Sequence, residues 1–544
     1  MTIKRALFSL LAAIGLSAPA AAQEARRPNF LIIIADDLGF SDIGAFGGEI
    51  ATPNLDALAY RGLRLTGFHV APTCSPTRSM LLSGTDNHLA GLGTMAELVA
   101  PNQKGKPGHE GYLRRDVATL AEILASGGYR TLFSGKWHLG LTAEQDPHAR
   151  GFQSSFALLQ GGHNHFGLGA SDRNGPTTYT RNGEVVTALP RDFYSSDYFA
   201  AQIIDEIGPQ RTGQPFFAYL AFTAPHWPLQ APPEDIARYR GRYDAGYEAL
   251  RKQRLKRQIA LGLLDPKTPV HTLDKRTPRW SSLSKAERAA AARDMEIYAA
   301  MVDRMDRNIG LVIEHLRRIG ELENTVILFM ADNGAEGIDF ARSELPSVKQ
   351  RLASADNSFA SRGTAASYIA YGPGWAQAAT APSWLYKAYT TEGGTRATAV
   401  LHYPGIARQG SVASAYLNVM DVVPTFLDLA GVQHPSSAGA KPNLQPVRGR
   451  SWSQWLRSRS ERVWPAEKAI GTELFGSRAV RRGDWKLVDT GDGKWRLFNI
   501  AADPGETRDL AGRQPDVREA LVAEWDVYAR DVGVVLPDQA TYRP

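Results

Sequence analysis

The chain has 544 residues, 43% of them hydrophobic and 22% charged, and a formal net charge of +6. This composition is typical of a folded globular protein and argues against a disordered or fibrous one. The chain is longer than a domain with a single hydrophobic core usually is, so two domains are expected. So small a net charge permits an anionic substrate but gives no reason to expect a nucleic-acid partner.

Residues 1–22 have the pattern of a secretory signal peptide. Lys4 and Arg5 precede an apolar run over residues 6–16, and three alanines at 20–22 end the segment. We expect cleavage after Ala22 and a periplasmic or secreted protein. The segment is too short for a membrane-spanning helix and no later stretch has the length for one, so no membrane partner is expected.

Residues 29–35 (NFLIIIA) form a continuous apolar run rich in β-branched side chains. The lack of alternation predicts a strand buried on both faces, as in a parallel sheet. Asp36 and Asp37 follow directly, which places two carboxylates at the carboxyl end of this strand. The next predicted element is an amphipathic helix that Pro53 opens and Gly62 ends.

Residues 72–84 (PTCSPTRSMLLSG) contain Cys74, the single cysteine of the chain. An intrachain disulfide is therefore excluded, and a lone cysteine stands out in an exported protein. Pro76 and the apolar run after Arg78 predict a loop that holds the thiol, with a helix starting immediately behind it. The helix N-terminus and Arg78 would make an anion site around the thiol. The alternative is a buried cysteine that acts as a small hydrophobic residue.

Three further apolar segments, at 129–133, 215–222 and 324–330, also predict buried strands. Polar side chains follow each of them: Lys136 and His138 after the first, His226 after the second, Asp332 and Asn333 after the third. Ligands of open α/β sheets bind outside the carboxyl ends of the strands. We therefore expect these side chains to meet the Asp36–Asp37 pair and Cys74 at one site.

The remaining segments predict helices and a second, smaller sheet. Residues 231–307 predict a helical insertion whose basic cluster is interpreted as a solvated helix face, and residues 415–431 predict a helix restarted or begun at Pro424. A polar stretch at 433–446 predicts a boundary loop. A hairpin is predicted over residues 484–488 and 495–498, and a helix over residues 517–528. The basic cluster consists of Arg251, Lys252, Arg254, Lys256 and Arg257.

These elements predict an α/β fold with two domains. A large, mostly parallel sheet between helices is expected over residues 23–435, and a smaller domain of antiparallel sheet plus helix over 436–544.

Asp36, Asp37, Asp332 and Asn333 offer oxygen ligands without sulfur or imidazole. Such a set suits a hard cation, and Ca²⁺ tolerates irregular oxygen geometry better than Mg²⁺ does. The alternative is that each acidic residue merely caps the element after it. His163 and His165 have no metal-ligand spacing to identifiable partners. Lining of the substrate entrance is the alternative, but packing or solvent exposure is expected for them.

The segment Cys74–Arg78 with the following Leu-Leu-Ser-Gly resembles the signature of type I sulfatases, and residues 128–138 resemble their second signature. Residues 224–232 (APHWPLQAP) and most of the mature chain are similar to bacterial arylsulfatases of the alkaline phosphatase superfamily. The resemblance implies that a formylglycine-generating enzyme oxidises Cys74 to formylglycine. It also implies one Ca²⁺ at Asp36, Asp37, Asp332 and Asn333, together with the modified Cys74 and the substrate sulfate.

The resemblance further implies a mechanism in which the hydrated formylglycine attacks the sulfur of a sulfate ester. A covalent intermediate divides one hard step into two easier ones, and the second hydroxyl of the hydrate expels sulfate. The implied roles are activation of the nucleophile by Asp332, charge stabilisation by Arg78, Lys136 and Lys387, proton acceptance by His138, and protonation of the leaving group by His226.

Two other functions are considered. One is hydrolysis of phosphonates or phosphate diesters on the same scaffold, because phosphate and sulfate esters differ more in charge than in shape. The other is non-catalytic binding of sulfated glycans with Cys74 left as a thiol, which would require neither the cysteine nor a general acid. The sequence does not identify the natural ester. The aromatic residues beside the expected site could line it or belong to the core: Trp137, Trp227, Trp384 and Tyr386.

Overall fold

The computed structural model describes residues 26–167, 177–209, 213–343, 345–437, 443–458, 460–539 and 541–542. The signal peptide expected at residues 1–22 lies outside these ranges, as does part of the boundary loop expected at 433–446.

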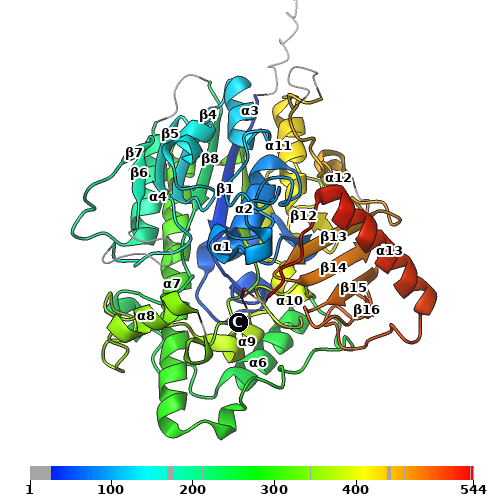
Figure 1. Cartoon of the computed structure of the whole chain (residues 1–544). Coiled ribbons are helices and arrows are strands. Elements are labelled where there is room, and N and C mark those ends of the chain that lie inside the picture. Colours follow the sequence, from blue (N-terminus) through cyan, green and yellow to red (C-terminus); the bar gives the residue numbers. More distant parts are fainter. Residues whose placement is uncertain are drawn as a thin grey trace, which may run out of the picture.

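A ten-stranded sheet, in the order β11-β2-β10-β9-β1-β8-β4-β5-β6-β7, forms the centre of the molecule (Figure 1). Its five middle strands, β9 to β5, are parallel to one another, and antiparallel strands extend both sides. The large α/β sheet expected from the sequence is confirmed, with a parallel centre and mixed edges. The middle strands are β1 (Asn29–Ala35), β4 (Arg130–Lys136), β5 (Ser154–Leu158), β8 (Phe216–Ala221) and β9 (Thr325–Ala331), and the outer ones are β2 (Leu63–Leu65), β6 (Tyr179–Arg181), β7 (Glu184–Val185), β10 (Ala399–His402) and β11 (Ser411–Ala413).

Helices cover both faces of this sheet (Figure 1). On one face α1, α4 and α7 pack together, and on the other α2, α3 and α11 do. With helices on both sides, every residue of β1, β8 and β9 is buried, which explains why their sequences are continuously apolar. The bounds of these helices are α1 (Pro53–Arg61), α2 (Cys74–Ser83), α3 (Leu120–Ser126), α4 (Ser195–Ile207), α7 (Lys285–Arg318) and α11 (Val422–Ala430).

A separate four-stranded antiparallel sheet, β13-β14-β15-β16, follows the large one, with α13 packed on it. Leu521 and Trp525 of α13 are buried against Val480 and Leu487 of the sheet. The predicted hairpin and final helix are thus confirmed. The elements are β13 (Ala469–Leu474), β14 (Ser477–Arg482), β15 (Trp485–Asp489), β16 (Arg496–Asn499) and α13 (Pro515–Val532); a two-stranded sheet pairs β3 (Phe68–His69) with β12 (Leu417–Asn418).

The predicted helical insertion consists of α5 (Pro233–Ala237), α6 (Tyr247–Ala260) and the start of the 34-residue α7. The Ser284 hydroxyl accepts from the Glu287 N–H and the Glu287 carboxylate accepts from the Ser284 N–H, so a capping box fixes where α7 begins. The remaining helices are α8 (Pro346–Ser354), α9 (Gly372–Ala379), α10 (Glu392–Thr395) and α12 (Ser453–Arg457).

The interpretation of the basic cluster on α6 as a solvated face is wrong for two of its members. Arg254 is fully buried, and its guanidinium forms ion pairs with Glu49, at 2.8 Å, and with Asp42. Arg251 is also buried and donates to backbone carbonyl oxygens, among them that of Pro382 at 3.0 Å. Pairing and carbonyl contacts replace the water that these guanidinium groups lose, so burial of charge is tolerated here.

The helix predicted over 415–431 is shorter than expected. Its first part forms β12 and a 3₁₀ turn, and α11 begins at Val422. Pro424 lies within the first turn of α11, where a missing N–H leaves no intrahelical bond unmade.

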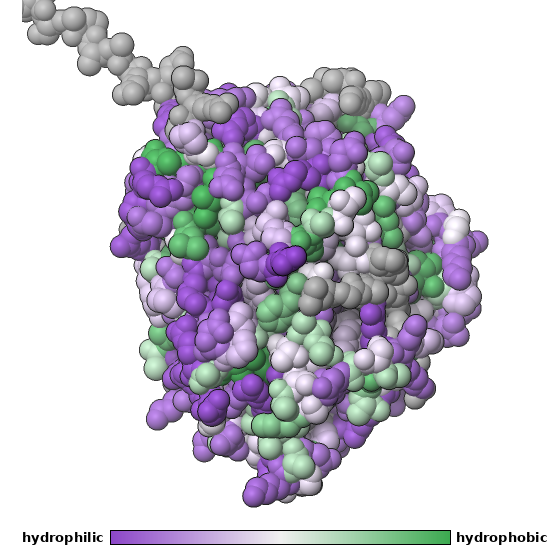
Figure 2. Space-filling model, turned by 90° about the vertical axis from the view of Figure 1, so that its left-hand side faces the viewer, coloured by the Kyte–Doolittle hydropathy of each residue, from purple (hydrophilic) through white to green (hydrophobic). Residues whose placement is uncertain are grey.

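Polar residues cover most of the face drawn in Figure 2, and apolar residues form only small groups among them. Among the described helices, none combines the length and apolar character that a membrane crossing requires.

Candidate active site

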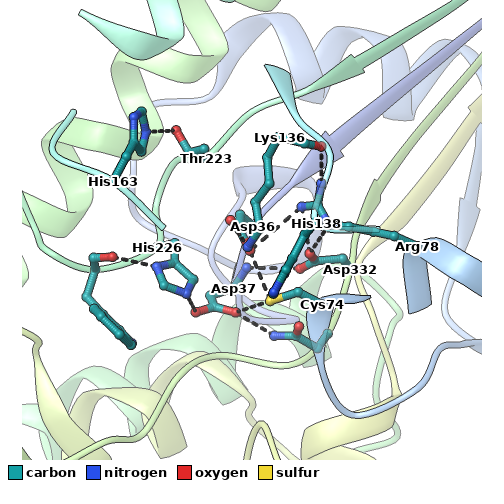
Figure 3. A network of polar contacts seen from close by, with 12 residues as sticks. Asp36, Asp37, Cys74, Arg78, Lys136, His138, His163, Thr223, His226 and Asp332 are labelled. Atoms are coloured by element: carbon teal, nitrogen blue, oxygen red, sulfur yellow. Dashed lines mark hydrogen bonds and ion pairs between the residues drawn. The ribbon is translucent and has the colours of Figure 1, made fainter. Parts of the chain in front are cut away.

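The carboxyl ends of four neighbouring strands meet at one edge of the large sheet. Asp36 and Asp37 follow β1, Asp332 follows β9, Lys136 ends β4, and His226 lies in the loop after β8 (Figure 3). Because β9, β1, β8 and β4 are adjacent and parallel, their polar ends converge as the sequence predicted.

Cys74 is the first residue of α2, preceded by the extended Thr73. The helix therefore begins at the cysteine itself, and not immediately behind it as the sequence predicted. Pro76 occupies the first turn, where its missing N–H has no partner in any case. The thiol is buried, with Sγ 3.3 Å from Asp36 Oδ1 and 3.8 Å from Asp37 Oδ1. Burial, together with the charge of Asp332, raises the pKa of this thiol well above its usual range.

An oxygen-rich cluster surrounds Asp37. The Asn333 amide nitrogen donates to Asp37 Oδ1 at 2.7 Å, and the Asp37 N–H donates to Asp332 Oδ1 at 3.2 Å. Asn333 Oδ1 is buried and has no hydrogen-bond partner within the described ranges. Asp36, Asp37, Cys74 and His226 can each place one ligand atom within 4.8 Å of the others. A buried carbonyl oxygen without a donor, beside three carboxylates, fits a hard cation.

Three buried cations balance these three carboxylates. Arg78 donates twice to Asp332 Oδ2, at 2.7 and 3.0 Å, and Lys136 Nζ donates to Asp36 Oδ2 at 2.7 Å. Lys387, expected here only from the family resemblance, donates to both oxygens of Asp37 at 2.8 and 2.9 Å. Burial alone would raise the pKa of Asp37, but Lys387, His226 and Lys136 outweigh it and hold that pKa well below its usual range.

Both predicted histidines face this cluster. His226 Nε2 lies 3.5 Å from Asp37 Oδ2, and burial lowers the pKa of His226 well below its usual value. His138 Nε2 lies 3.0 Å from Glu97 Oε1, while its Nδ1 is buried without a hydrogen-bond partner in the described part of the chain. The pKa of Glu97 would rise on burial, but the charge and hydrogen bond of His138 lower it to about 2.

His163 and His165 lie behind the site and are packed there, which was one of the two outcomes expected for them. His163 Nε2 is 2.8 Å from the Thr223 hydroxyl, and His165 Nε2 is 3.0 Å from the carbonyl oxygen of His226. They brace the loop that carries His226.

A narrow cavity of about 50 Å³ opens at Cys74. Its polar end is formed by Cys74, His138, His226 and Lys387, and its other end is mostly apolar. Of the four aromatic residues beside the predicted site, Trp227 lines the cavity. Trp137 and Tyr386 are buried core residues, and Trp384 packs on Phe498 of the small sheet.

The family model described as "Sulfatase" matches residues 28–432, which is most of the chain. The chain belongs to the sulfatase family. A second model, "N-sulphoglucosamine sulphohydrolase, C-terminal", matches residues 382–524 of this sulfatase.

Two relatives extend the likeness along nearly the whole sulfatase. An uncharacterized sulfatase of Schizosaccharomyces pombe is 47% identical over 527 residues, covering 94% of this chain and 95% of the relative. An arylsulfatase of Klebsiella aerogenes is 40% identical over 456 residues, covering 83% and 96%. Among solved structures, Ps i-CgsB in complex with k-i-k-neocarrahexaose has the same fold, with a TM-score of 0.66, 24% identity and 95% of each chain covered. Family and relatives together support sulfate ester hydrolysis by this sulfatase.

Three residues of the sulfatase site were not predicted from the sequence: Glu97, Glu336 and Tyr542. Glu336 follows Asn333 by three residues in a strand-end loop, so the rule that selected Asp332 could have found it. Glu97 lies in a short 3₁₀ helix (Ala96–Leu98) and Tyr542 in an irregular segment, and neither sequence carries a periodic signal.

Proposed function

We propose that this sulfatase hydrolyses sulfate monoesters to an alcohol or phenol and sulfate, using a formylglycine generated from Cys74. The observation that carries the proposal is the position of Cys74. It is the first residue of a helix, lies 3.3 Å from Asp36, and lines the polar end of a cavity beside Lys387 and two histidines. A helix N-terminus surrounded by cations suits a tetrahedral anion.

We infer that Asp36, Asp37, Asp332 and Asn333 hold one Ca²⁺, with the modified side chain of residue 74 as a further ligand. The all-oxygen set and the unpartnered Asn333 Oδ1 support this inference. When bound, Ca²⁺ supplies a positive charge beside the sulfate ester, and the hydrated formylglycine supplies the attacking hydroxyl.

The cationic side chains would bind and orient the ester. Arg78 is fixed by Asp332 and by the carbonyl oxygen of Lys136, at 2.8 Å, so it contributes a positioned charge. Lys136 and Lys387 are primary amines on flexible stems whose Nζ atoms already lie among the carboxylates, and they can turn toward an incoming anion. Such preorganised charge stabilises the negative charge that develops in the transition state.

His226 is the proposed proton donor to the leaving oxygen of the ester. His138 is the proposed base for the second step, in which residue 74 releases sulfate and becomes the aldehyde again. Burial favours neutral His226 in the protein alone. The negative charge of a bound sulfate ester favours the imidazolium form that proton donation requires. Glu97 orients His138 through the 3.0 Å contact with Nε2, and Nδ1 makes no hydrogen bond within the described ranges.

We further propose that the chain is exported and that the maturation of Cys74 precedes or accompanies export. Residues 1–22 would direct the chain to the periplasm or the medium, and a formylglycine-generating enzyme would act before the thiol is buried. Residues 23–435 are proposed as the catalytic domain and 436–544 as the small domain.

The first experiment is a peptide mass spectrum across Cys74 of protein purified from its own host, combined with turnover of 4-nitrophenyl sulfate. The proposal expects an aldehyde in place of the thiol, a mature N-terminus at residue 23, and hydrolysis that a Cys74→Ala variant abolishes. An unmodified, normally alkylated thiol in the exported protein would contradict the catalytic proposal and favour a binding role.

The same protein should be assayed on a phosphonate monoester and a phosphate diester of 4-nitrophenol. If kcat/KM is higher for either of these than for the sulfate, with residue 74 fully converted, the proposed substrate class is wrong.

The metal site is tested separately. Asn333→Ala should weaken Ca²⁺ binding measured by calorimetry, whereas Asn324→Ala, outside the site, should not.

A further inference from the structure

The apolar end of the cavity includes a residue from a distant part of the chain. After α13 the backbone returns toward the large domain, where the Leu536 carbonyl oxygen accepts from the Asn102 side chain at 2.9 Å (Figure 1). Six residues later, Tyr542 lines the cavity that Cys74 and Lys387 also line. Its side chain is buried and packs at a tilt against Phe475, with ring centroids 5.6 Å apart.

Tyr542 is tied to Lys387 through one carboxylate. Its hydroxyl donates to Glu336 and lies 2.9 Å from both carboxylate oxygens. The same carboxylate is 3.2 Å from Lys387 Nζ and accepts the Ile338 N–H at 2.9 Å. The phenol ring is therefore held by its oxygen as well as by packing.

The side chains around Tyr542 form an apolar rim. Tyr542 packs in one apolar cluster with residues from three other segments: the 3₁₀ helix at 96–98 and the residue before it, helix α8, and the loop after Lys387. Members of this cluster that also line the cavity are Met95, Leu98, Trp227, Leu345 and Val348. Tyr368, whose ring contacts that of Trp227, completes the rim. The polar end of the cavity suits the sulfate group, so the organic part of the ester must lie against this rim.

The cavity is small for an ester with a large organic part. Its volume is about 50 Å³, and a cavity needs roughly 10–15 Å³ in this measure to hold one water molecule. A tyrosine ring is one of the largest side chains that could limit this space. Removal of the ring would therefore enlarge the apolar end. It would also remove the hydrogen bond to Glu336, which contacts Lys387, but Lys387 holds the sulfate group that every ester shares, so this effect cancels when two esters are compared.

We propose that Tyr542 is a specificity-determining residue, which sets the size of the leaving group that the apolar rim accepts. The inference rests on the proposed function. The Tyr542–Glu336 hydrogen bond fixes the ring at the edge of the cavity, and the ring excludes leaving groups that extend past it.

The test compares kcat/KM for a compact ester, 4-nitrophenyl sulfate, with that for a larger one, 4-methylumbelliferyl sulfate. Tyr542→Ala should raise the ratio of large to compact ester by tenfold or more, and Tyr542→Trp should lower it. Tyr542→Phe keeps the ring and should change the ratio less than Tyr542→Ala does. Leu536→Ala, on the same segment but with an exposed side chain, should leave the ratio within twofold of the parent value.

An unchanged ratio in both Tyr542→Ala and Tyr542→Trp, in folded and active protein, would overturn the inference alone. If Tyr542→Ala fails to fold, the Tyr542→Trp variant decides. If the parent protein with formylglycine hydrolyses neither ester, the proposed function fails instead. In that case the dissociation constants of both esters are measured by calorimetry on the same proteins. If the ratio of the two constants is the same in the parent and in the Tyr542 variants, the inference is again overturned.

Discussion

At the scale of single residues, the site is organised by carboxylates that hold other side chains in place. Asp332 fixes Arg78, Glu336 links Lys387 to Tyr542, and Glu97 holds His138. Asp332 and Glu336 are buried and Glu97 is half-buried, so the contacts they make are worth more than similar contacts on the surface. Their contribution can be measured by changing the carboxylate and leaving its partner intact.

Glu97→Gln should lower kcat for an aryl sulfate by roughly 10- to 100-fold with little change in KM, because a positioned acid–base group contributes about 10²–10⁴-fold. The amide keeps the shape of the carboxylate but cannot stabilise a positive charge on His138. The pH profile of kcat should therefore also shift relative to the parent enzyme.

Glu110→Gln provides the control, because Glu110 pairs with Arg114 in a half-buried position and does not line the cavity. A purely structural role for Glu97 would lower the melting temperature without moving the pH profile, and that result would contradict the prediction.

At the scale of elements, the strand ends position the chemically active side chains, and the end of β4 leaves no room for a larger residue before Lys136. Gly135, directly before Lys136, has φ of +121°, and a Cβ built on it would lie 1.8 Å from the Ala221 carbonyl oxygen on β8. Only glycine lets the two strands stay paired there while Lys136 points to the site.

Gly135→Ala should lower the free energy of unfolding by roughly 2–5 kcal/mol, from backbone strain and overpacking together. Urea unfolding would measure it. Gly512→Ala is the matched control, since its added Cβ meets no atom within 4 Å and its φ is not in the left-handed region. Equal stability of the two variants would contradict this explanation of Gly135.

Helix α6 offers a second test at this scale. Arg254→Leu should lower the free energy of unfolding by about 3–5 kcal/mol, because it leaves Glu49 and Asp42 as buried charges without their partner. Lys252→Leu, on the same helix but exposed, should change it by less than about 0.5 kcal/mol. Similar losses in both variants, measured by urea unfolding, would restore the solvated-face interpretation.

The sequence was most informative where pattern and chemistry coincide. Continuous apolar runs identified β1, β4, β8 and β9, and the polar residues after them could be placed together because parallel strands end at one edge. Arg254 was misjudged because hydrophobic periodicity cannot distinguish a solvated arginine from a buried, paired one. Tyr542 could not be foreseen, since its place depends on how a loop segment folds back over a domain far away in sequence.

At the scale of the whole molecule, buried ion pairs join the small sheet to the large domain. His88 Nδ1 is 3.0 Å from Asp86, and His88 Nε2 is 3.3 Å from Glu473 of β13. Nearby, Lys486 of β15 pairs with Glu392 at 2.8 Å, five residues after Lys387. The small sheet is thus attached close to the active site.

The His88 pair should make stability fall with rising pH. Burial lowers the pKa of His88, but Asp86 and Glu473 outweigh it and raise that pKa to about 9. Because the pKa of His88 is higher in the folded than in the unfolded protein, its protonation stabilises the fold. This contribution to the free energy of unfolding, about 3 kcal/mol, is complete below pH 6.5 and is lost as pH rises from 6.5 through 9. Unfolding in urea between pH 6 and pH 9.5 would measure this slope.

Glu473→Gln should flatten that slope, because the amide no longer favours the imidazolium. The overall stability of this variant is expected to be lower at pH 6, where the pair contributes fully. If the parent and the variant lose stability in parallel between pH 6.5 and pH 9, another group is responsible.

The burial of Cys74 has a consequence for how a population of molecules becomes active. In the finished fold the thiol is 1% exposed, so the enzyme that we propose converts it to formylglycine would have to reach the chain earlier. Modification and folding then compete for each newly made molecule, and the specific activity of a preparation records which of the two was faster. A variant that folds sooner could be more stable and yet contain more inactive molecules. These would have the same fold as the active ones and would differ from them only in the mass of residue 74.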